Sequence, residues 1–299
     1  MAIPHPIPYQ GSKRNLAGTI LSYFPSAIDT LIEPFAGSAA ISIASAVNGK
    51  ARRYWINDIN ESLILLWHFI INHPNTLGDS YERLWESQLG RERSFYDSVR
   101  KRFNQNGRPH YFLYLLARCV KASIRYNSFG DFNQSPDNRR KGRQPASMKR
   151  EISAVSRLFQ NRVRLSNWDY REVLKFATSK DLVYMDPPYQ GVSDGSDARY
   201  VSGICHKEFA AALAELNERH VPFIVSYDGR TGTKRFGRRL PANLDLHHIE
   251  VNAGRSTQAT LLGRSDSTVE SLYLSPALMR KVRINIEAQP YQLALLETV

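Results

Sequence analysis

The stretch Asp186-Pro187-Pro188-Tyr189 brings a carboxylate, a stiff backbone and an aromatic ring together at one point of the chain. It follows the apolar run at 182–185, which predicts a short buried strand that the prolines end, because proline cannot donate to a sheet ladder. The stiff turn fixes the direction of its carbonyl groups, and the Asp186 carboxylate is a second strong acceptor. Two acceptors aimed at one point suit a planar amino group, and Tyr189 can stack on the ring that carries it.

Fixed acceptors on such an amine would draw its hydrogens out of conjugation with the ring. The nitrogen lone pair would then be free to attack an electrophilic methyl group. No base needs to remove a proton first, because the amine becomes acidic only once it has been methylated. The chemistry predicted for this turn is therefore positioning and charge placement rather than acid–base catalysis.

A second turn, in the sequence IEPFAGSAAIS, lies between a predicted strand and a predicted helix. Gly37 in this turn permits a close backbone approach or a positive φ, although the full G-x-G-x-x-G fingerprint is absent. Asp58 ends the next predicted strand about twenty residues later, where an acid can bind ribose hydroxyls. Together the two features predict a nucleoside-containing cofactor held without a pyrophosphate cradle. S-adenosylmethionine fits that description.

The elements that must position these residues alternate between strand and helix in both the first sixty residues and the second half of the chain. We predict strands at 29–37, 51–60, 163–170, 182–185 and 222–229, a β region at 244–275, and helices at 15–25, 38–47, 148–160 and 206–220. From residue 61 to about 158 the apolar residues recur at helical spacing. The predicted fold class is α/β with a central, mostly parallel sheet built from residues 1–60 and 148–299 and interrupted by a helical domain at 61–147.

The charge of the chain is concentrated in the predicted insertion. The 299 residues carry a net charge of +12, and residues 91–150 alone contain 15 Lys/Arg against 4 Asp/Glu. Such a concentration indicates a polyanionic partner, of which nucleic acid is the commonest.

Composition also excludes several classes of protein. The N-terminal residues lack the apolar run of a signal peptide, and no window of the sequence approaches a membrane span. The two cysteines, Cys119 and Cys205, form neither a disulfide framework nor a set of metal ligands. We therefore expect a protein of the reducing cytoplasm that needs no metal ion.

These stretches, taken in order over roughly residues 8–275, resemble the Dam-type DNA adenine-N6 methyltransferases. The resemblance implies a Rossmann-like methyltransferase fold, S-adenosylmethionine as cofactor and double-stranded DNA as substrate, with one adenine flipped out of the stack. By the same resemblance, the Asp186 side chain and the Pro187 carbonyl hold the amino group of that adenine. Pro188 completes the family's D-P-P-Y motif, and Tyr189 stacks on the flipped base.

Two further stretches are similar to the family's cofactor motifs. EPFAGSAA resembles the F-x-G-x-G loop, with Ala39 where the second glycine is usual, and PYQGSK resembles the N-terminal motif that meets the methionine end of the cofactor. Asp58 matches the ribose-binding acid, and Asp169 in NWDY resembles the later acid near the cofactor's adenine. The resemblance thus assigns cofactor binding to Tyr9, Lys13, Phe35, Gly37, Asp58 and Asp169.

The stretch RYNSFGDFN resembles the family's R-Y-N-x-x-G-x-F-N DNA-recognition hairpin. Its first three side chains are suited to phosphate, stacking and base-edge contacts respectively. The following residues, QSPDNRRKGRQP, depart from the family's VPFG continuation, so the resemblance does not extend to a recognised DNA sequence. The residues expected to contact DNA are Arg125, Tyr126, Asn127, Asn133, Arg139 and Arg140.

Two alternatives to a site-specific adenine-N6 methyltransferase remain open at this point. The same turn can hold any planar amino group, so adenine in RNA or cytosine N4 in DNA is a possible target. A DNA-binding module without catalysis is the other alternative, for which Ala39 is the only hint. The sequence also leaves open a restriction endonuclease counterpart, the oligomeric state, and whether the tail at 277–299 is a helix, an edge strand or a docking segment.

Overall fold

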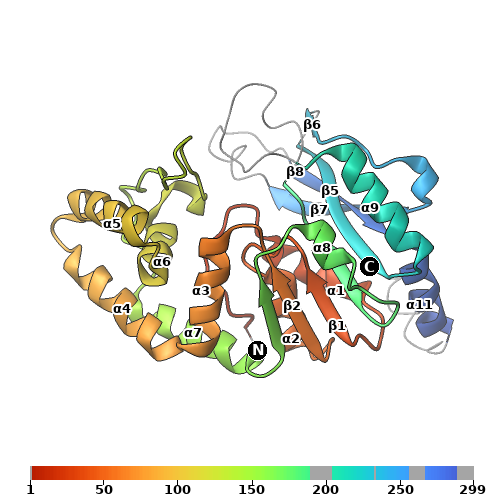
Figure 1. The fold of residues 1–299 in the computed structure, drawn as a ribbon, viewed down its shortest axis with the longest axis horizontal. Helices are drawn as coiled ribbons and strands as arrows, with labels where there is room; N and C mark the ends of the chain where they lie inside the picture. The colour runs from red at the N-terminus through yellow and green to blue at the C-terminus, as the bar shows by residue number, and fades with distance from the viewer. Residues whose placement is uncertain (1, 189–203, 232–233, 256–266, 288–299) are drawn as a thin grey trace.

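The computed structural model describes residues 2–188, 204–231, 234–255 and 267–287 (Figure 1). The predicted α/β fold class is confirmed. In chain order the elements are η1 (Lys13–Asn15), α1 (Ala17–Ser22), β1 (Thr30–Glu33), α2 (Ala40–Val47), β2 (Arg53–Asn57), α3 (Glu61–Asn72), α4 (Pro74–Ser87), α5 (Glu92–Asn106), α6 (Pro109–Arg118), η2 (Val120–Ala122), α7 (Pro145–Phe159), β3 (Val163–Ser166), α8 (Tyr170–Leu174), β4 (Leu182–Met185), α9 (His206–Glu218), β5 (Phe223–Thr231), β6 (Lys234–Phe236), η3 (Ala242–Leu244), β7 (His247–Arg255), β8 (Ser267–Leu274) and α11 (Pro276–Glu287).

The central sheet has the strand order β3-β2-β1-β4-β5-β8-β7, with β6 paired to β5. The pairs among β1 to β5 along this path are parallel, whereas β8 runs antiparallel to both β5 and β7. All four residues of β4 are buried, as expected for a central strand covered on both faces. The carboxyl ends of β1, β2 and β4 therefore meet at one edge, where open α/β sheets bind ligands.

Two hydrophobic cores cover the two faces of the sheet because successive strand residues point to opposite sides. One core packs side chains such as Leu31 and Leu182 against α1, α2, α3 and α7. The other packs their neighbours Ile32 and Val183 against α8 and α9. The corner after β4 is thus held between two packed layers.

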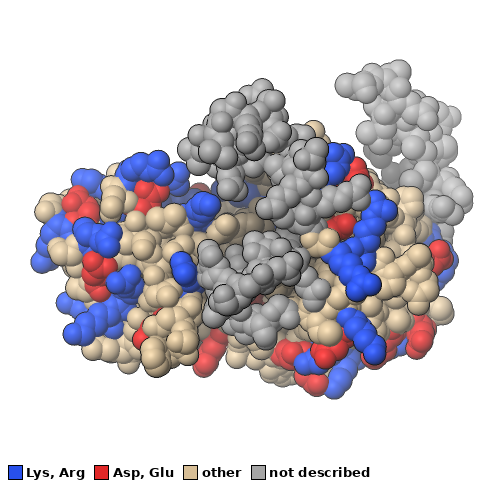
Figure 2. All heavy atoms as spheres, turned by 90° about the horizontal axis from the view of Figure 1, so that it is seen from above, with Lys and Arg blue, Asp and Glu red and all other residues tan. Residues whose placement is uncertain are grey.

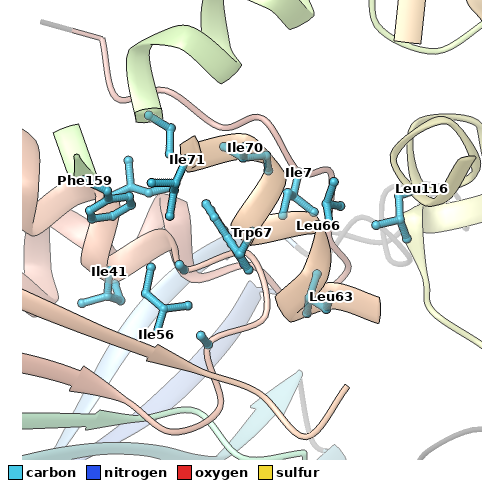
Figure 3. Close-up of a cluster of buried hydrophobic side chains, with 14 of the residues drawn as sticks. Ile7, Ile41, Ile56, Leu63, Leu66, Trp67, Ile70, Ile71, Leu116 and Phe159 are labelled. Carbon is cyan, nitrogen blue, oxygen red and sulfur yellow. The ribbon is translucent and has the colours of Figure 1, made fainter. Parts of the chain in front are cut away.

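The helices α3 to α6 form a group beside the sheet, joined to it by the packing of α3 and α7 (Figure 1). The α3 residues Leu63, Leu66, Trp67 and Ile70 pack among sheet and α2 side chains in one cluster (Figure 3). Trp67 is fully buried, and its Nε1 donates a hydrogen bond to the carbonyl of Gly37 at 3.0 Å. The first helix of the insertion therefore anchors the glycine turn directly. The predicted domain boundaries, 1–60 and 148–299 around 61–147, stay a prediction.

The tail, which the sequence left open, begins as the helix α11, with Leu278 buried in the first core. Residues 288–299 lie outside the described part of the chain. Among the described residues, no helix has the length and apolar character needed to cross a membrane. The same residues contain no group of three or more His, Cys, Asp or Glu that could hold a metal ion.

Candidate active site

The corner after β4 lies at the carboxyl edge of the sheet. Asp186 has a side chain that is 21% exposed, Pro187 is buried and Pro188 is half-buried. Tyr189, the fourth residue of the predicted catalytic motif, lies outside the described residues. The carboxylate is therefore accessible at the edge while its backbone is fixed by packing.

Lys13 links this corner to the antiparallel end of the sheet. Its Nζ lies 3.0 Å from Asp186 Oδ1 and 3.1 Å from Glu270 Oε2, and the lysine side chain is only 7% exposed. The Ser226 hydroxyl donates to Glu270 Oε2 at 3.2 Å. The sequence assigned Lys13 to the cofactor and gave Glu270 and Ser226 no role. The structure joins all three to Asp186 in one chain of contacts, from Ser226 to Glu270 to Lys13, because η1, β4, β5 and β8 meet at this edge.

Burial changes the acidity of the carboxyls at this edge. It raises the pKa of Asp186 to about 6, an effect opposed by Lys13 and reinforced by Glu270. It also raises the pKa of Glu33, at the end of β1, to about 7, partly offset by hydrogen bonds from Ser42. At neutral pH Asp186 is therefore mainly the charged acceptor, held in that form by Lys13, and Glu33 is divided between its two forms.

Sequence reasoning missed Glu33. Its Oε2 accepts the backbone N–H of Ser42 at 2.9 Å, inside the first turn of α2. The bond ties the end of β1 to the helix that follows the glycine turn. The sequence did hold a sign of this role, because Glu33 ends an apolar strand directly before Pro34. A carboxylate buried there needs a nearby hydrogen-bond donor.

The glycine turn has left-handed backbone at two positions. Gly37 has φ 51° and packs under Tyr9: a Cβ placed on Gly37 would lie 2.9 Å from Tyr9 Cε1. Ala39 has φ 45° and ψ 40°, a conformation that costs an L-residue about 1–2 kcal/mol. The resembled loop usually has glycine at this position, which adopts a positive φ at no steric cost. Ala39 adopts the positive φ nonetheless, and the turn carries this strain.

The other predicted cofactor residues lie around this turn. Both Asp58 oxygens accept backbone N–H groups, from Gly37 and from Asn60, each at 2.9 Å. Burial raises the pKa of Asp58. Phe35 packs on Tyr170 with ring centroids 5.0 Å apart. The structure therefore brings Tyr9, Lys13, Phe35, Gly37 and Asp58 together at the carboxyl edge of β1 and β2.

Asp169 is the residue before α8, and its hydrogen bonds with Arg171 there were not predicted from the sequence. Its carboxylate caps the helix by accepting from the backbone N–H of Arg171 at 2.9 Å. The Arg171 guanidinium also pairs with it and lowers its pKa. A contact between Asp169 and the cofactor's adenine stays a prediction.

Gly37→Ala is expected to lower the free energy of unfolding by about 2 kcal/mol, from the left-handed φ together with displacement of the Tyr9 ring. The matched control is Gly49→Ala, because Gly49 has φ 61° but nothing within 4 Å of an added Cβ. This control should lose only about 1 kcal/mol, the cost of the backbone conformation alone. Urea unfolding measures both losses. Equal losses would show that contact with Tyr9 does not matter.

The predicted recognition hairpin is held by Asn127. The Asn127 Oδ1 accepts the backbone N–H groups of Phe129 at 3.0 Å and of Asp131 at 2.8 Å. The Tyr126 hydroxyl is hydrogen-bonded to the Asn60 side chain, and its ring packs on Phe132. Asn127 thus shapes the loop, a role that sequence reasoning missed. Its predicted contact with a base edge, and the stacking predicted for Tyr126, stay predictions.

The remaining predicted DNA contacts surround this hairpin. Arg139 and Arg140 are 81% and 76% exposed, and both pair with the carboxylate of Asp137. Phe129, at the hairpin tip, is 89% exposed, the largest fraction among the exposed large apolar side chains of the described residues. Sequence reasoning did not single out Phe129.

Arg125 and Asn133 flank the hairpin and are joined by a backbone bond from Asn133 N–H to the carbonyl of Arg125 at 2.9 Å. Within the described residues, the Asn133 Oδ1 is buried without a hydrogen-bond partner. The structure therefore gathers Arg125, Tyr126, Asn127 and Asn133 in one hairpin beside the helices.

A mostly parallel sheet with an antiparallel β8, and a carboxylate corner beside a glycine turn at its carboxyl edge, define a protein of the Rossmann-like methyltransferase class. The chain belongs to the D12 class N6 adenine-specific DNA methyltransferase family, whose sequence model matches residues 9–256. The predicted family, fold class and adenine-specific DNA methyltransferase activity are thereby confirmed. The family description names methylation of adenine N6 in DNA. It names neither of the alternative targets, adenine in RNA and cytosine N4, nor a DNA-binding module without catalysis.

Several characterised proteins are similar over most of the chain. A DNA adenine methylase of Vibrio cholerae is 27% identical over 86% of this chain and 91% of its own length. The retron Ec67 DNA adenine methylase of Escherichia coli is 28% identical over 84% of this chain and 87% of its own length. The modification methylase StsI of Streptococcus sanguinis is 24% identical over 85% of this chain but only 40% of its own length.

Proposed function

We propose that this DNA adenine methyltransferase takes its methyl group from S-adenosylmethionine and acts on one adenine flipped out of double-stranded DNA. The observation that carries the proposal is the position of Asp186. Its carboxylate ends the central strand β4, is held by Lys13 at 3.0 Å, and lies at the same sheet edge as the glycine turn. An acceptor for the target amine is thereby fixed beside the turn that we assign to the cofactor.

The residues around the turn fit S-adenosylmethionine. A Cβ at Gly37 would lie 2.9 Å from Tyr9 Cε1, so only glycine at this position lets the Tyr9 ring pack against the turn. We assign the positive charge of Lys13, which Asp186 and Glu270 hold at this edge, to the carboxylate of the methionine end. Asp58, half-buried directly after β2, is the acid that we assign to the ribose. When bound, the cofactor supplies an electrophilic methyl group on a sulfonium.

The reaction asks the protein for orientation rather than for a base. We assign the Asp186 carboxylate and the Pro187 carbonyl as acceptors for the two hydrogens of adenine N6, and Tyr189 as the ring that stacks on the base. Lys13 positions the Asp186 carboxylate, and Glu270, which accepts from Ser226, holds Lys13 from its other side. The nitrogen lone pair then points away from the acceptors, and fixed charges stabilise the positive charge that develops on the amine.

The activity of the wild-type enzyme is expected to fall as the pH drops through about 6. The pKa of Asp186 is about 6 in the folded protein, and below that value its protonated carboxyl becomes a donor where an acceptor is needed. The measurement is kcat/KM for methyl transfer to a short duplex between pH 5 and 8.5. A profile that stays flat through pH 6 would remove Asp186 as the titrating acceptor.

We assign the DNA-binding surface to the face seen in Figure 2, where Lys and Arg gather over the helical group and again on the opposite lobe. The segment that joins α6 to α7 rises above the helices on this side (Figure 1). It contains the hairpin with Arg125, Asn127 and the exposed Phe129, followed by Arg139 and Arg140.

The double variant Arg139→Ala/Arg140→Ala is expected to weaken DNA binding and to flatten its salt dependence. Loss of two phosphate contacts reduces the slope of log K against log salt by about 1.8. Fluorescence anisotropy of a labelled duplex at 50 to 200 mM salt measures the slope. Identical slopes for the variant and the wild type would place both arginines outside the interface.

The experiment that tests the proposed function uses S-adenosylmethionine with a labelled methyl group and several duplexes of varied sequence. After transfer, the DNA is digested to nucleosides and separated by chromatography. Label in N6-methyladenine and none in N4-methylcytosine is the expected result. The same assay with RNA of equal sequence serves as the control, and label in RNA alone would contradict the proposal.

One relative is named a modification methylase, which supports, for this chain, the proposal of a restriction endonuclease counterpart. A cytoplasmic location stays a prediction, supported by Cys119 and Cys205, which form no disulfide.

A further inference from the structure

A hollow lies at the opposite edge of the sheet from the candidate active site. It has a volume of about 770 Å³ and is lined by the loops that enter β1, β2 and β4, by Arg162 before β3, and by Lys281 of α11. None of the residues assigned to cofactor, adenine or hairpin contacts lines it. The hollow is therefore a separate surface.

The lining of this hollow is strongly basic. It includes five cations, Lys50, Arg52, Arg162, Lys180 and Lys281, but one acid, Asp29. Each cation comes from a different loop or helix except Lys50 and Arg52, which share the loop before β2. Because these segments are far apart in sequence, the fold itself gathers the charge.

The cations are poorly compensated within the described part of the chain. Asp29 approaches Arg52 only at 3.8 Å, in a pair whose arginine side chain is 80% exposed, and such exposed pairs are worth at most about 1 kcal/mol. The Arg162 guanidinium donates to the carbonyls of Ala51 and Arg52, which fixes its position without neutralising it. Lys281 likewise donates to the carbonyl of Ser179. The described residues offer no carboxylate to Lys50 or Lys180.

We propose that this hollow binds the phosphate backbone of a second stretch of duplex DNA while the catalytic edge holds the first. The proposal rests on double-stranded DNA as the substrate. Cations from several segments around an open hollow, with Lys50, Arg52 and Lys180 exposed, suit an extended chain of phosphates better than one small ligand, which would need enclosed donors. Duplex DNA presents such a chain, with one charge per about 1.7 Å of its axis.

The same short duplex cannot reach both surfaces. The two edges are separated by the length of the strands, four to five residues in β1 to β4, which is about 15 Å, and by the loops at either end. DNA is stiff over about 150 base pairs, so a duplex of 20 base pairs cannot turn around the domain. The hollow therefore holds a second segment, which would let the enzyme pass between distant parts of a long DNA molecule.

Sedimentation velocity of the full-length enzyme with a methylatable 20-base-pair duplex tests the proposal. The wild type is expected to form a species with one enzyme and two duplexes at low salt. Lys50→Ala/Lys180→Ala should stop at one duplex, or bind the second at least tenfold more weakly with a salt slope lower by about 1.8. The control Arg157→Ala/Lys207→Ala removes the same charge from α7 and α9, outside both the hollow and the residues assigned to DNA contacts, and should retain the second duplex.

Methyl transfer to the same duplex, measured in the same preparations, separates this proposal from the proposed function. Unchanged kcat/KM for Lys50→Ala/Lys180→Ala with loss of the second duplex supports a separate DNA site. A wild-type complex that saturates at one duplex, although the duplex is methylated, would overturn the proposal. So would one-to-one binding of inorganic pyrophosphate at micromolar concentration without a second duplex, because the hollow would then hold a small phosphate ligand.

Discussion

Asp186→Ala is expected to lower kcat for methyl transfer by about 10²- to 10³-fold, which is roughly 3–4 kcal/mol of transition-state stabilisation. The variant loses the carboxylate that we assign to the adenine amine, while Lys13 keeps its second partner, Glu270, at 3.1 Å. The affinity for S-adenosylmethionine should therefore change little, and the protein should stay folded. Single-turnover methyl transfer and a cofactor titration measure the two quantities separately.

Asp186→Asn and Asp181→Ala complete this experiment. The asparagine variant keeps the shape but not the charge, and we expect it to be almost as impaired as the alanine variant. Asp181 lies at the other end of the same strand, where it accepts from Thr178 and from the backbone N–H of Thr30. Asp181→Ala should lower stability without slowing methyl transfer at saturating substrate. A fast Asp186→Ala enzyme would contradict the assigned role.

Lys13→Met is expected to lower the free energy of unfolding by about 3–5 kcal/mol at pH 8, the cost of leaving a buried charge without its partner. The change removes the cation that lies between Asp186 and Glu270, whose side chains are 21% and 17% exposed. Without Lys13 the pKa of Asp186 rises above its present value of about 6. The neutral form of the carboxyl is then the one that the folded state prefers.

The loss in Lys13→Met should depend on pH in a defined direction. When the folded pKa of a carboxyl lies above its unfolded value, the folded state binds the extra proton, so stability increases as the pH falls from 8 towards 5. Urea unfolding at pH 5.5 and pH 8 should show the smaller loss at pH 5.5. Lys13→Met/Glu270→Gln should recover part of the stability at pH 8. A loss below about 1 kcal/mol that is the same at both pH values would show that the cluster is not coupled.

Much of the fold could be predicted because its signals are local. Apolar runs that alternate with segments of helical spacing predicted the positions of β1, α2, β2, β4, α9 and β5. The family match confirms the class of fold. The corner at Asp186 was predictable for the same reason. Two prolines after a buried run can only end a strand, and the end of a parallel strand is where such sheets bind ligands.

The partners of the site residues could not be predicted, because they depend on which strands become neighbours. Lys13, Asp186 and Glu270 are separated by at least 84 residues and meet only because β8 inserts beside β5. The anchoring of α2 by Glu33 and the bond from Trp67 to Gly37 likewise require the packed fold. In the hairpin, the sequence predicted a base contact for Asn127. It could not show that the Asn127 Oδ1 accepts backbone N–H groups of its own loop.

The two basic surfaces also differ in whether the sequence could predict them. The excess charge of residues 91–150 is visible in the sequence as a run, and it lies in the helical group. The cations at the opposite edge are scattered between residues 50 and 281 and become a surface only when four parallel strands align their entry loops. The basic segment at 91–150 could therefore be predicted from the sequence, whereas the basic hollow could not.

The most direct measurement is a crystal structure of the enzyme with a methylatable duplex and an unreactive analogue of S-adenosylmethionine. We predict that N6 of one extrahelical adenine lies within about 3.2 Å of both an Asp186 carboxylate oxygen and the Pro187 carbonyl oxygen. The methyl-bearing position of the analogue should face the opposite side of that nitrogen. An adenine bound elsewhere, with both acceptors still turned towards protein groups, would contradict the central claim.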